Sequence, residues 1–255
     1  MQASPTLDTA GTAPRAATRA PAAGRRVIDA PTRMAHWLFA FGFLGAYVTA
    51  ESERWRLLHV TLGYIVAGVL VFRLLYGLFG PRASGLGVLA NRFKGFVTWL
   101  RTTVQMRPTA ASHWRQGLTV TLGAGIVAML LLVLPLTLSG YATYEEWGGP
   151  WIGEWLEETH EFFANALLAL VLAHLALIAA LSWVRRRNQA MPMITGRTEG
   201  QGPDLVKANR AWLAGLLLLA VLAFGAWQWQ SSPQGLLPDS SVTGHRHGDR
   251  HGDDD

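Results

Sequence analysis

The sequence contains no cysteine among its 255 residues. This absence excludes disulfides, thiolate metal sites, cysteine-held iron–sulfur clusters and covalently attached c-type haem. Charged residues are also scarce, at 15%, whereas half of all residues are hydrophobic. Because a typical soluble domain contains about 25% charged residues, the composition indicates a membrane protein.

Five apolar segments are each about 20 residues long. With a rise of about 1.5 Å per residue, each can cross a hydrocarbon core of about 30 Å as a helix. The first segment lies too far from the N-terminus, and is too aromatic, for a cleaved signal peptide. We therefore expect an all-α membrane protein with five spans, at Thr32–Ala50, Leu57–Phe79, Gly117–Ala142, Thr159–Val184 and Ala211–Gln230.

Lys and Arg are distributed unevenly between the two sides of these spans. One set of connections holds seventeen basic residues and the other set holds four. Because basic loops remain in the cytoplasm, we expect a cytoplasmic N-terminus and an external C-terminus. The same asymmetry accounts for the net charge of +5 and leaves no reason to expect a nucleic-acid partner. The basic set is 1–33, 81–116 and 185–210, and the other is 51–56, 143–158 and 231–255.

The remaining segments differ in composition from the spans. Residues 1–25 are rich in Ala, Thr, Pro and Arg, which favours a disordered cytoplasmic arm. The Ala83–Gln116 connection is predicted to contain an amphipathic segment on the membrane surface. Residues 199–230 form a linker followed by the fifth span; this span contains no charge and no histidine, and is interpreted as an accessory helix. Residues 231–255 form a His- and Asp-rich periplasmic tail, which could bind a divalent metal but is more simply a solvated tail.

Two histidines, His160 and His174, lie in the fourth span, fourteen residues apart. This spacing corresponds to about 21 Å of rise and about 1400° of rotation, only about 40° short of four turns. The two side chains therefore share one helix face at two depths. Ionisable residues within a membrane are costly and usually face an internal site. The alternative is a pair of buried histidines that bond to neighbouring polar groups.

Two more histidines match those depths. His36 opens the first span at its cytoplasmic end, and His59 opens the second at its external end. The alternating direction of the spans places His59 level with His160, and His36 level with His174. One neutral imidazole from each of two antiparallel helices is the ligand set of a six-coordinate b-type haem. The sequence thus predicts two haem b groups, with iron bound axially by His36, His59, His160 and His174.

Three further residues are candidates for haem contacts. Arg73 lies fourteen residues after His59, on the same face and about 21 Å deeper. Its guanidinium would suit a haem propionate, and the alternative is snorkelling to the interface. Arg33, three residues before His36, could act likewise, although the positive-inside bias explains it equally well. Gly63, one turn after His59, would let a porphyrin approach the backbone, or would serve helix packing.

Four segments carry a resemblance to the bacterial cytochrome b561 family, within the broad group that includes the cytochrome b subunits of hydrogenases and formate dehydrogenases. The resemblance covers residues 26–198 and implies a four-helix domain with two haems b, held by the same four histidines. Where relatives often carry Gly-His-Asn-Pro, this chain has "SHWRQG", so His113 is interpreted as interfacial and not as a ligand. The matching segments are "DAPTRMAHWLFA" (Asp29–Ala40), "LHVTLGYIVAGVLVFRLLYGLFGPR" (Leu58–Arg82), "THEFFANALLALVLAHLA" (Thr159–Ala176) and "MPMITGR" (Met191–Arg197).

The resemblance implies transmembrane electron transfer between the membrane quinone pool and a periplasmic partner, such as a c-type cytochrome or a dehydrogenase subunit. The protein would be an electron carrier of the respiratory chain that acts as a quinone-linked oxidoreductase, or as the membrane subunit of one. The acidic, aromatic loop 143–158 is a candidate docking surface for a basic partner.

Two other classes of function are alternatives to electron transfer. A transporter or metal permease would use the histidines as ligands or proton carriers. It is disfavoured because no span contains an internal Asp or Glu to pair with them. A structural assembly factor would leave the four depth-matched histidines unexplained.

Overall fold

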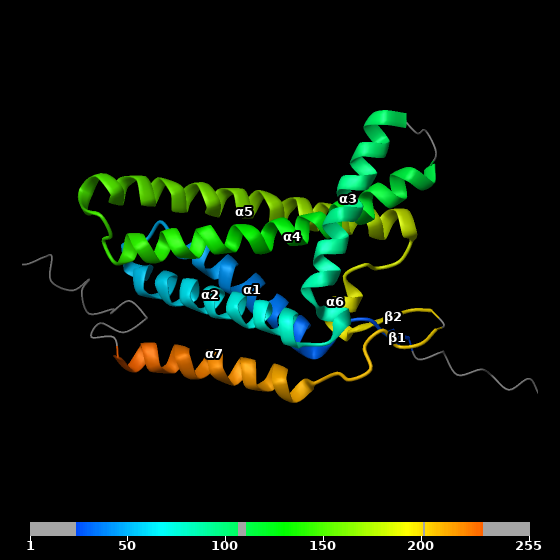
Figure 1. Cartoon of the computed structure of the whole chain (residues 1–255). Coiled ribbons are helices and arrows are strands. Elements are labelled where there is room, and N and C mark those ends of the chain that lie inside the picture. The colour runs from blue at the N-terminus through cyan, green and yellow to red at the C-terminus, as the bar shows by residue number, and fades with distance from the viewer. Residues whose placement is uncertain (1–23, 107–110, 201, 232–255) are drawn as a thin grey trace, which may run out of the picture.

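The computed structural model describes residues 24–106, 111–200 and 202–231, and this part of the chain is almost entirely helical. Five long helices lie side by side, with α4 and α5 on one side of α1 and α2, and α7 on the other (Figure 1). The three helices α1, α4 and α7 begin at one end of the bundle, whereas α2 and α5 begin at the opposite end. Their bounds are α1 Ala30–Thr49, α2 Arg56–Phe79, α4 Ala111–Tyr144, α5 Gly149–Arg185 and α7 Ala211–Ser231.

Short elements lie at the ends of the long helices. The Ala83–Gln116 connection holds helix α3 (Leu86–Met106), which crosses the bundle at a steep angle near the start of α1 (Figure 1). Arg25, the last residue of the predicted arm over 1–25, pairs with Thr198, and residues 1–23 of that arm lie outside the described residues. The other short elements are 3-10 helices η1 (Glu53–Trp55) and η2 (Arg82–Ser84), helix α6 (Met191–Thr195), and the antiparallel strands β1 (Arg25–Arg26) and β2 (Arg197–Thr198).

Four helices of the described part are long and apolar enough to cross a membrane. The first predicted span is not among them, because polar residues such as Arg33 and His36 in the first turns of α1 lower its mean hydropathy. The protein is therefore a multi-pass helical membrane protein, and the crossing by α1 stays a prediction. The four spans are Glu53–Phe79, His113–Tyr144, Gly149–Arg185 and Ala211–Ser231.

The two longest helices exceed the thickness of a bilayer core. Helix α4 has 34 residues and α5 has 37, so they are about 51 Å and about 55 Å long. A hydrocarbon core measures only about 30 Å. Both helices therefore extend well beyond the apolar region.

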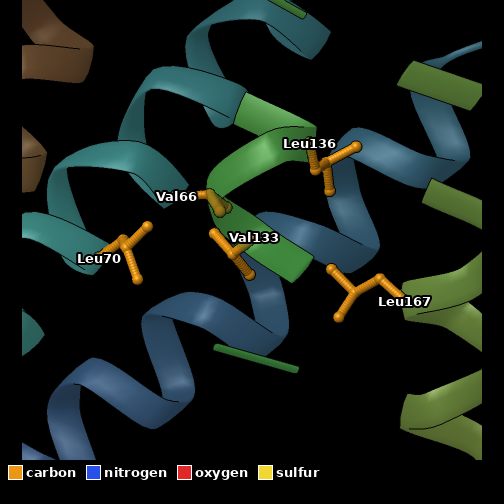
Figure 2. Packing of buried hydrophobic residues seen from close by; sticks show 5 residues of the cluster. All are labelled: Val66, Leu70, Val133, Leu136 and Leu167. Atoms are coloured by element: carbon orange, nitrogen blue, oxygen red, sulfur yellow. The ribbon is translucent and has the colours of Figure 1, made fainter. Parts of the chain in front are cut away.

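The apolar core lies in the middle of the bundle, where side chains from α2, α4 and α5 converge (Figure 2). Partly buried Phe39 and Phe43 of α1 pack against it. Leu167 stands midway between His160 and His174 in the chain, so the core separates the two histidine levels along α5. The buried residues of this cluster are Val66, Leu70, Val133, Leu136 and Leu167.

Candidate functional site

His59 and His160, here called the outer pair, face each other between α2 and α5. Their ring centroids are 6.1 Å apart and the ring planes are nearly perpendicular, at 78°. Nδ1 of His59 lies 2.8 Å from the carbonyl oxygen of Ala46, and Nδ1 of His160 lies 3.0 Å from that of Leu136. When Nδ1 carries the proton and donates to the carbonyl, Nε2 is left as a metal-binding nitrogen. The backbone therefore fixes the orientation of both rings and leaves each Nε2 free of this contact.

His36 and His174, here called the inner pair, come from α1 and α5. The two imidazoles are near enough for their charges to interact. Nδ1 of each ring is buried and has no hydrogen-bond partner in the described part of the chain. The ring of His36 also packs edge-on against Trp37, with centroids 5.2 Å apart. The inner imidazoles thus differ from the outer pair in having an unsatisfied Nδ1.

The unpartnered polar atoms concentrate in the residues of the inner level. Buried polar groups in proteins almost always have a partner, and leaving one unpaired costs about 1–3 kcal/mol. Four of the five residues with such an atom are the ones that the sequence predicts for the inner level. Such a concentration is typical of a binding site. Within the described residues, the buried atoms without a partner are Thr32 Oγ1, Arg33 Nε, His36 Nδ1, Arg73 Nη1 and His174 Nδ1.

The segment that contains α6 holds the start of α1 in place. Nη1 of Arg33 donates to the carbonyl oxygen of Ile194 at 2.6 Å, and Nε1 of Trp37 donates to that of Met193 at 3.2 Å. The carbonyl oxygen of Gly196 accepts from the backbone N–H groups of Val27 and Ile28, at 2.9 and 3.2 Å. Sequence reasoning treated this segment as a family marker only. Its main-chain carbonyls orient Arg33.

Replacing Gly196 should destabilise the protein. Gly196 has a φ of +75°, and an added Cβ would lie 2.7 Å from the carbonyl oxygen of Ile28. A left-handed conformation costs a non-glycine residue about 1–2 kcal/mol. We expect Gly196→Ala to lower the Tm by roughly 3–6 °C in a thermal unfolding experiment. In the control Gly215→Ala, the new Cβ would meet no described atom within 4 Å. Equal Tm values for the two variants would contradict this role.

Two glycines border the outer pair in different ways. A Cβ added to Gly140 of α4 would lie 2.6 Å from Cε1 of His160, so this glycine makes room for the imidazole. Sequence reasoning missed Gly140, because a single glycine in a long apolar helix gives no recognisable signal. A Cβ added to Gly63 would meet no described atom within 4 Å. The space beside Gly63, one turn after His59, is thus open.

His113 is bonded within the α3–α4 hairpin. Its ring stacks on Trp99, with centroids 5.4 Å apart, and Nε2 lies 2.7 Å from Oγ1 of Thr103. These contacts explain the position of the His113 side chain, so no bound ligand is needed to explain it. The predicted tail histidines, in 231–255, lie outside the described residues.

One family model, described as prokaryotic cytochrome b561, matches residues 27–196, which contain both histidine pairs, Arg33, Arg73 and α6 but not α7. Searches of curated proteins and of solved structures found no match. Since the matched range covers about two thirds of the chain, the protein belongs to the prokaryotic cytochrome b561 family, a family of membrane-embedded b-type cytochromes.

Proposed function

We propose that the protein carries single electrons across the bacterial inner membrane by means of two b-type haems. The outer pair, His59 and His160, would bind one haem iron, and the inner pair, His36 and His174, the other. Family membership supports the haem type. The observation that carries the assignment is the set of buried, unpartnered nitrogen atoms in the residues of the inner level.

The donor set at the inner level fits a haem. It offers two imidazoles from different helices and two guanidinium groups, those of Arg33 and Arg73, each with a buried N–H donor that lacks a partner in the described chain. Haem propionates are anions, and guanidinium groups bind carboxylates through strong charge-assisted hydrogen bonds. We therefore assign Arg33 and Arg73 to the propionates, and the two imidazoles to the iron.

The outer level fits a haem for a different reason. Both Nδ1 atoms bond to backbone carbonyls, as is usual for metal-binding histidines, and this bond fixes the tautomer and the ring orientation. The open space beside Gly63 supports the proposal that a flat macrocycle lies against α2 at this level.

Haem iron, when bound, supplies reversible one-electron chemistry. The chain holds the ligands at two depths, because His160 and His174 share one face of α5 about 21 Å apart. Buried aliphatic side chains such as Val66, Leu70 and Leu167 pack between these depths and exclude water. The two sites therefore lie towards opposite ends of the bundle.

The proposed partners are a membrane quinone or quinol and a periplasmic redox protein, such as a c-type cytochrome or a dehydrogenase subunit. The N-terminus would be cytoplasmic, as the basic loops predict. At the external end, Trp147, Trp151 and Trp155 are 55%, 90% and 62% exposed. The five Glu residues in 143–158 form no salt bridge within the described residues. This surface would complement a basic partner.

The test is a count of haem in the purified protein. We expect about two haems b per chain, from the dithionite-reduced minus oxidised spectrum and quantitation as the pyridine haemochrome. A protein without haem, prepared from cells supplied with haem, would refute the proposal and favour the metal-permease alternative. A count of one haem would refute the assignment of two ligand pairs.

A further inference from the structure

Asp29 is fully buried, at 0% exposure, immediately before the first residue of α1. One carboxylate oxygen accepts a hydrogen bond from the backbone N–H of Thr32 at 3.2 Å and so caps the helix. The other oxygen accepts from the hydroxyl groups of Tyr76 at 2.6 Å and Ser84 at 3.1 Å. Burying a carboxylate is costly unless it is hydrogen-bonded. The three hydrogen bonds to its oxygens therefore offset the cost of burying the Asp29 carboxylate.

These bonds connect three parts of the protein. Tyr76 lies in the last turn of α2, and Ser84 lies in η2. The hydroxyl oxygen of Tyr76 also lies 3.5 Å from Nη1 of Arg210, the residue before α7. In addition, the backbone N–H of Ala30 donates to the carbonyl oxygen of Asn209 at 3.1 Å. The carboxylate therefore joins the start of α1 to the end of α2, and through Tyr76 to the segment that follows the family-matched range.

Asp29 also acts on the charge of the inner level. Arg73 lies three residues, about one turn, before Tyr76, whose hydroxyl group donates to Asp29. Asp29 and Arg73 form no direct salt bridge, and Nη1 of Arg73 has no hydrogen-bond partner in the described chain. The carboxylate thus adds a negative charge near Arg73 while leaving the buried Nη1 donor of Arg73 available.

We propose that Asp29 is a positioning residue for the inner haem site. Its carboxylate sets the height of α1 relative to α2, so that Arg33 and His36 stand level with Arg73. His36 follows Asp29 by seven residues, or about two turns, so a displaced cap displaces the imidazole with it. This inference rests on the proposed function, because it concerns the same inner site. Asp29 itself touches neither imidazole of the inner pair.

The test compares three variants in full-length protein. Asp29→Ala removes the carboxylate, and Tyr76→Phe removes only its bond to α2 and keeps the charge. The control is Asp204→Asn, because the exposed Asp204 bonds the backbone N–H of Arg26 at the same end of the bundle. The outer haem in each molecule serves as an internal reference. The readouts are haem content, the midpoint potential and electron paramagnetic resonance signal of each haem, and hydrogen exchange of the first turns of α1.

We expect Asp29→Ala and Tyr76→Phe to lower the occupancy of the inner haem or shift its potential, and to speed exchange at the start of α1. The outer haem, and all readouts of Asp204→Asn, should stay as in the wild type. An unchanged inner haem in both variants would overturn the proposal, and so would equal loss of both haems. If Asp29→Ala does not fold, Tyr76→Phe decides alone. A wild-type protein without two haems would instead refute the proposed function.

Discussion

His174→Ala should reduce the haem content from about two to about one per chain. His174 is the proposed contribution of α5 to the inner iron, and its Nδ1 has no partner within the described residues. Without it, His36 would be the only imidazole at the inner level. The outer site should remain, because the apolar core around Leu167 separates it from the substitution. Haemochrome quantitation and the reduced-minus-oxidised spectrum measure the result.

The control for this variant is His113→Ala. His113 is also an imidazole at the end of the bundle where α1 begins, but its ring is engaged by Trp99 and Thr103 in the α3–α4 hairpin. The control should keep both haems, apart from any loss through weaker packing of the hairpin. Two haems with unaltered spectra in His174→Ala would show that the ligand assignment is wrong.

Gly140→Ala should have the opposite selectivity and disturb the outer haem. The new methyl group would lie 2.6 Å from Cε1 and 2.8 Å from Nδ1 of His160, well inside contact distance. The imidazole would have to rotate, and the bond from Nδ1 to the carbonyl oxygen of Leu136 would be lost. Since that bond fixes the ring orientation, we expect loss of the outer haem or a clear change in its potential and resonance signal.

Gly125→Ala is the matched control on the same helix. A Cβ at Gly125 would meet no described atom within 4 Å, and this residue lies fifteen positions from Gly140, about 22 Å along α4. The outer haem should therefore be unaffected in the control. If Gly140→Ala retained an outer haem with wild-type potential and signal, the position of His160 would not depend on the gap at Gly140.

Part of this architecture follows from the sequence because helical periodicity is rigid. The fourteen-residue spacing of His160 and His174 predicts two levels on α5, and the alternating direction of the helices predicts the pairing with His59 and His36. The structure brings His59 against His160 and His36 near His174. These expectations need only the rise and rotation of a helix.

The supporting contacts could not be predicted in the same way. Asp29 bonds Tyr76 and Ser84 across 47 and 55 positions of the chain, and Gly140 acts by having no side chain next to His160. The peptide carbonyls that hold Arg33 and Trp37 belong to every residue type, so no side-chain pattern marks them. For α1, the sequence predicts the helix more firmly than the membrane crossing. The polar residues in its first turns are also typical of a helix that lies at the membrane surface.

The length of α5 has a consequence for how a redox partner would reach the proposed outer haem. Residues 149–161 precede the apolar part of the helix, and thirteen residues rise about 20 Å. With the apolar part spanning the bilayer, these residues would extend beyond the hydrocarbon core, and His160 would lie near the edge of that core. A redox partner that contacts residues 149–161 would not need a lipid anchor or an inserted loop. If the orientation is as proposed, free diffusion through the periplasm would suffice to bring such a partner within reach of the proposed outer haem.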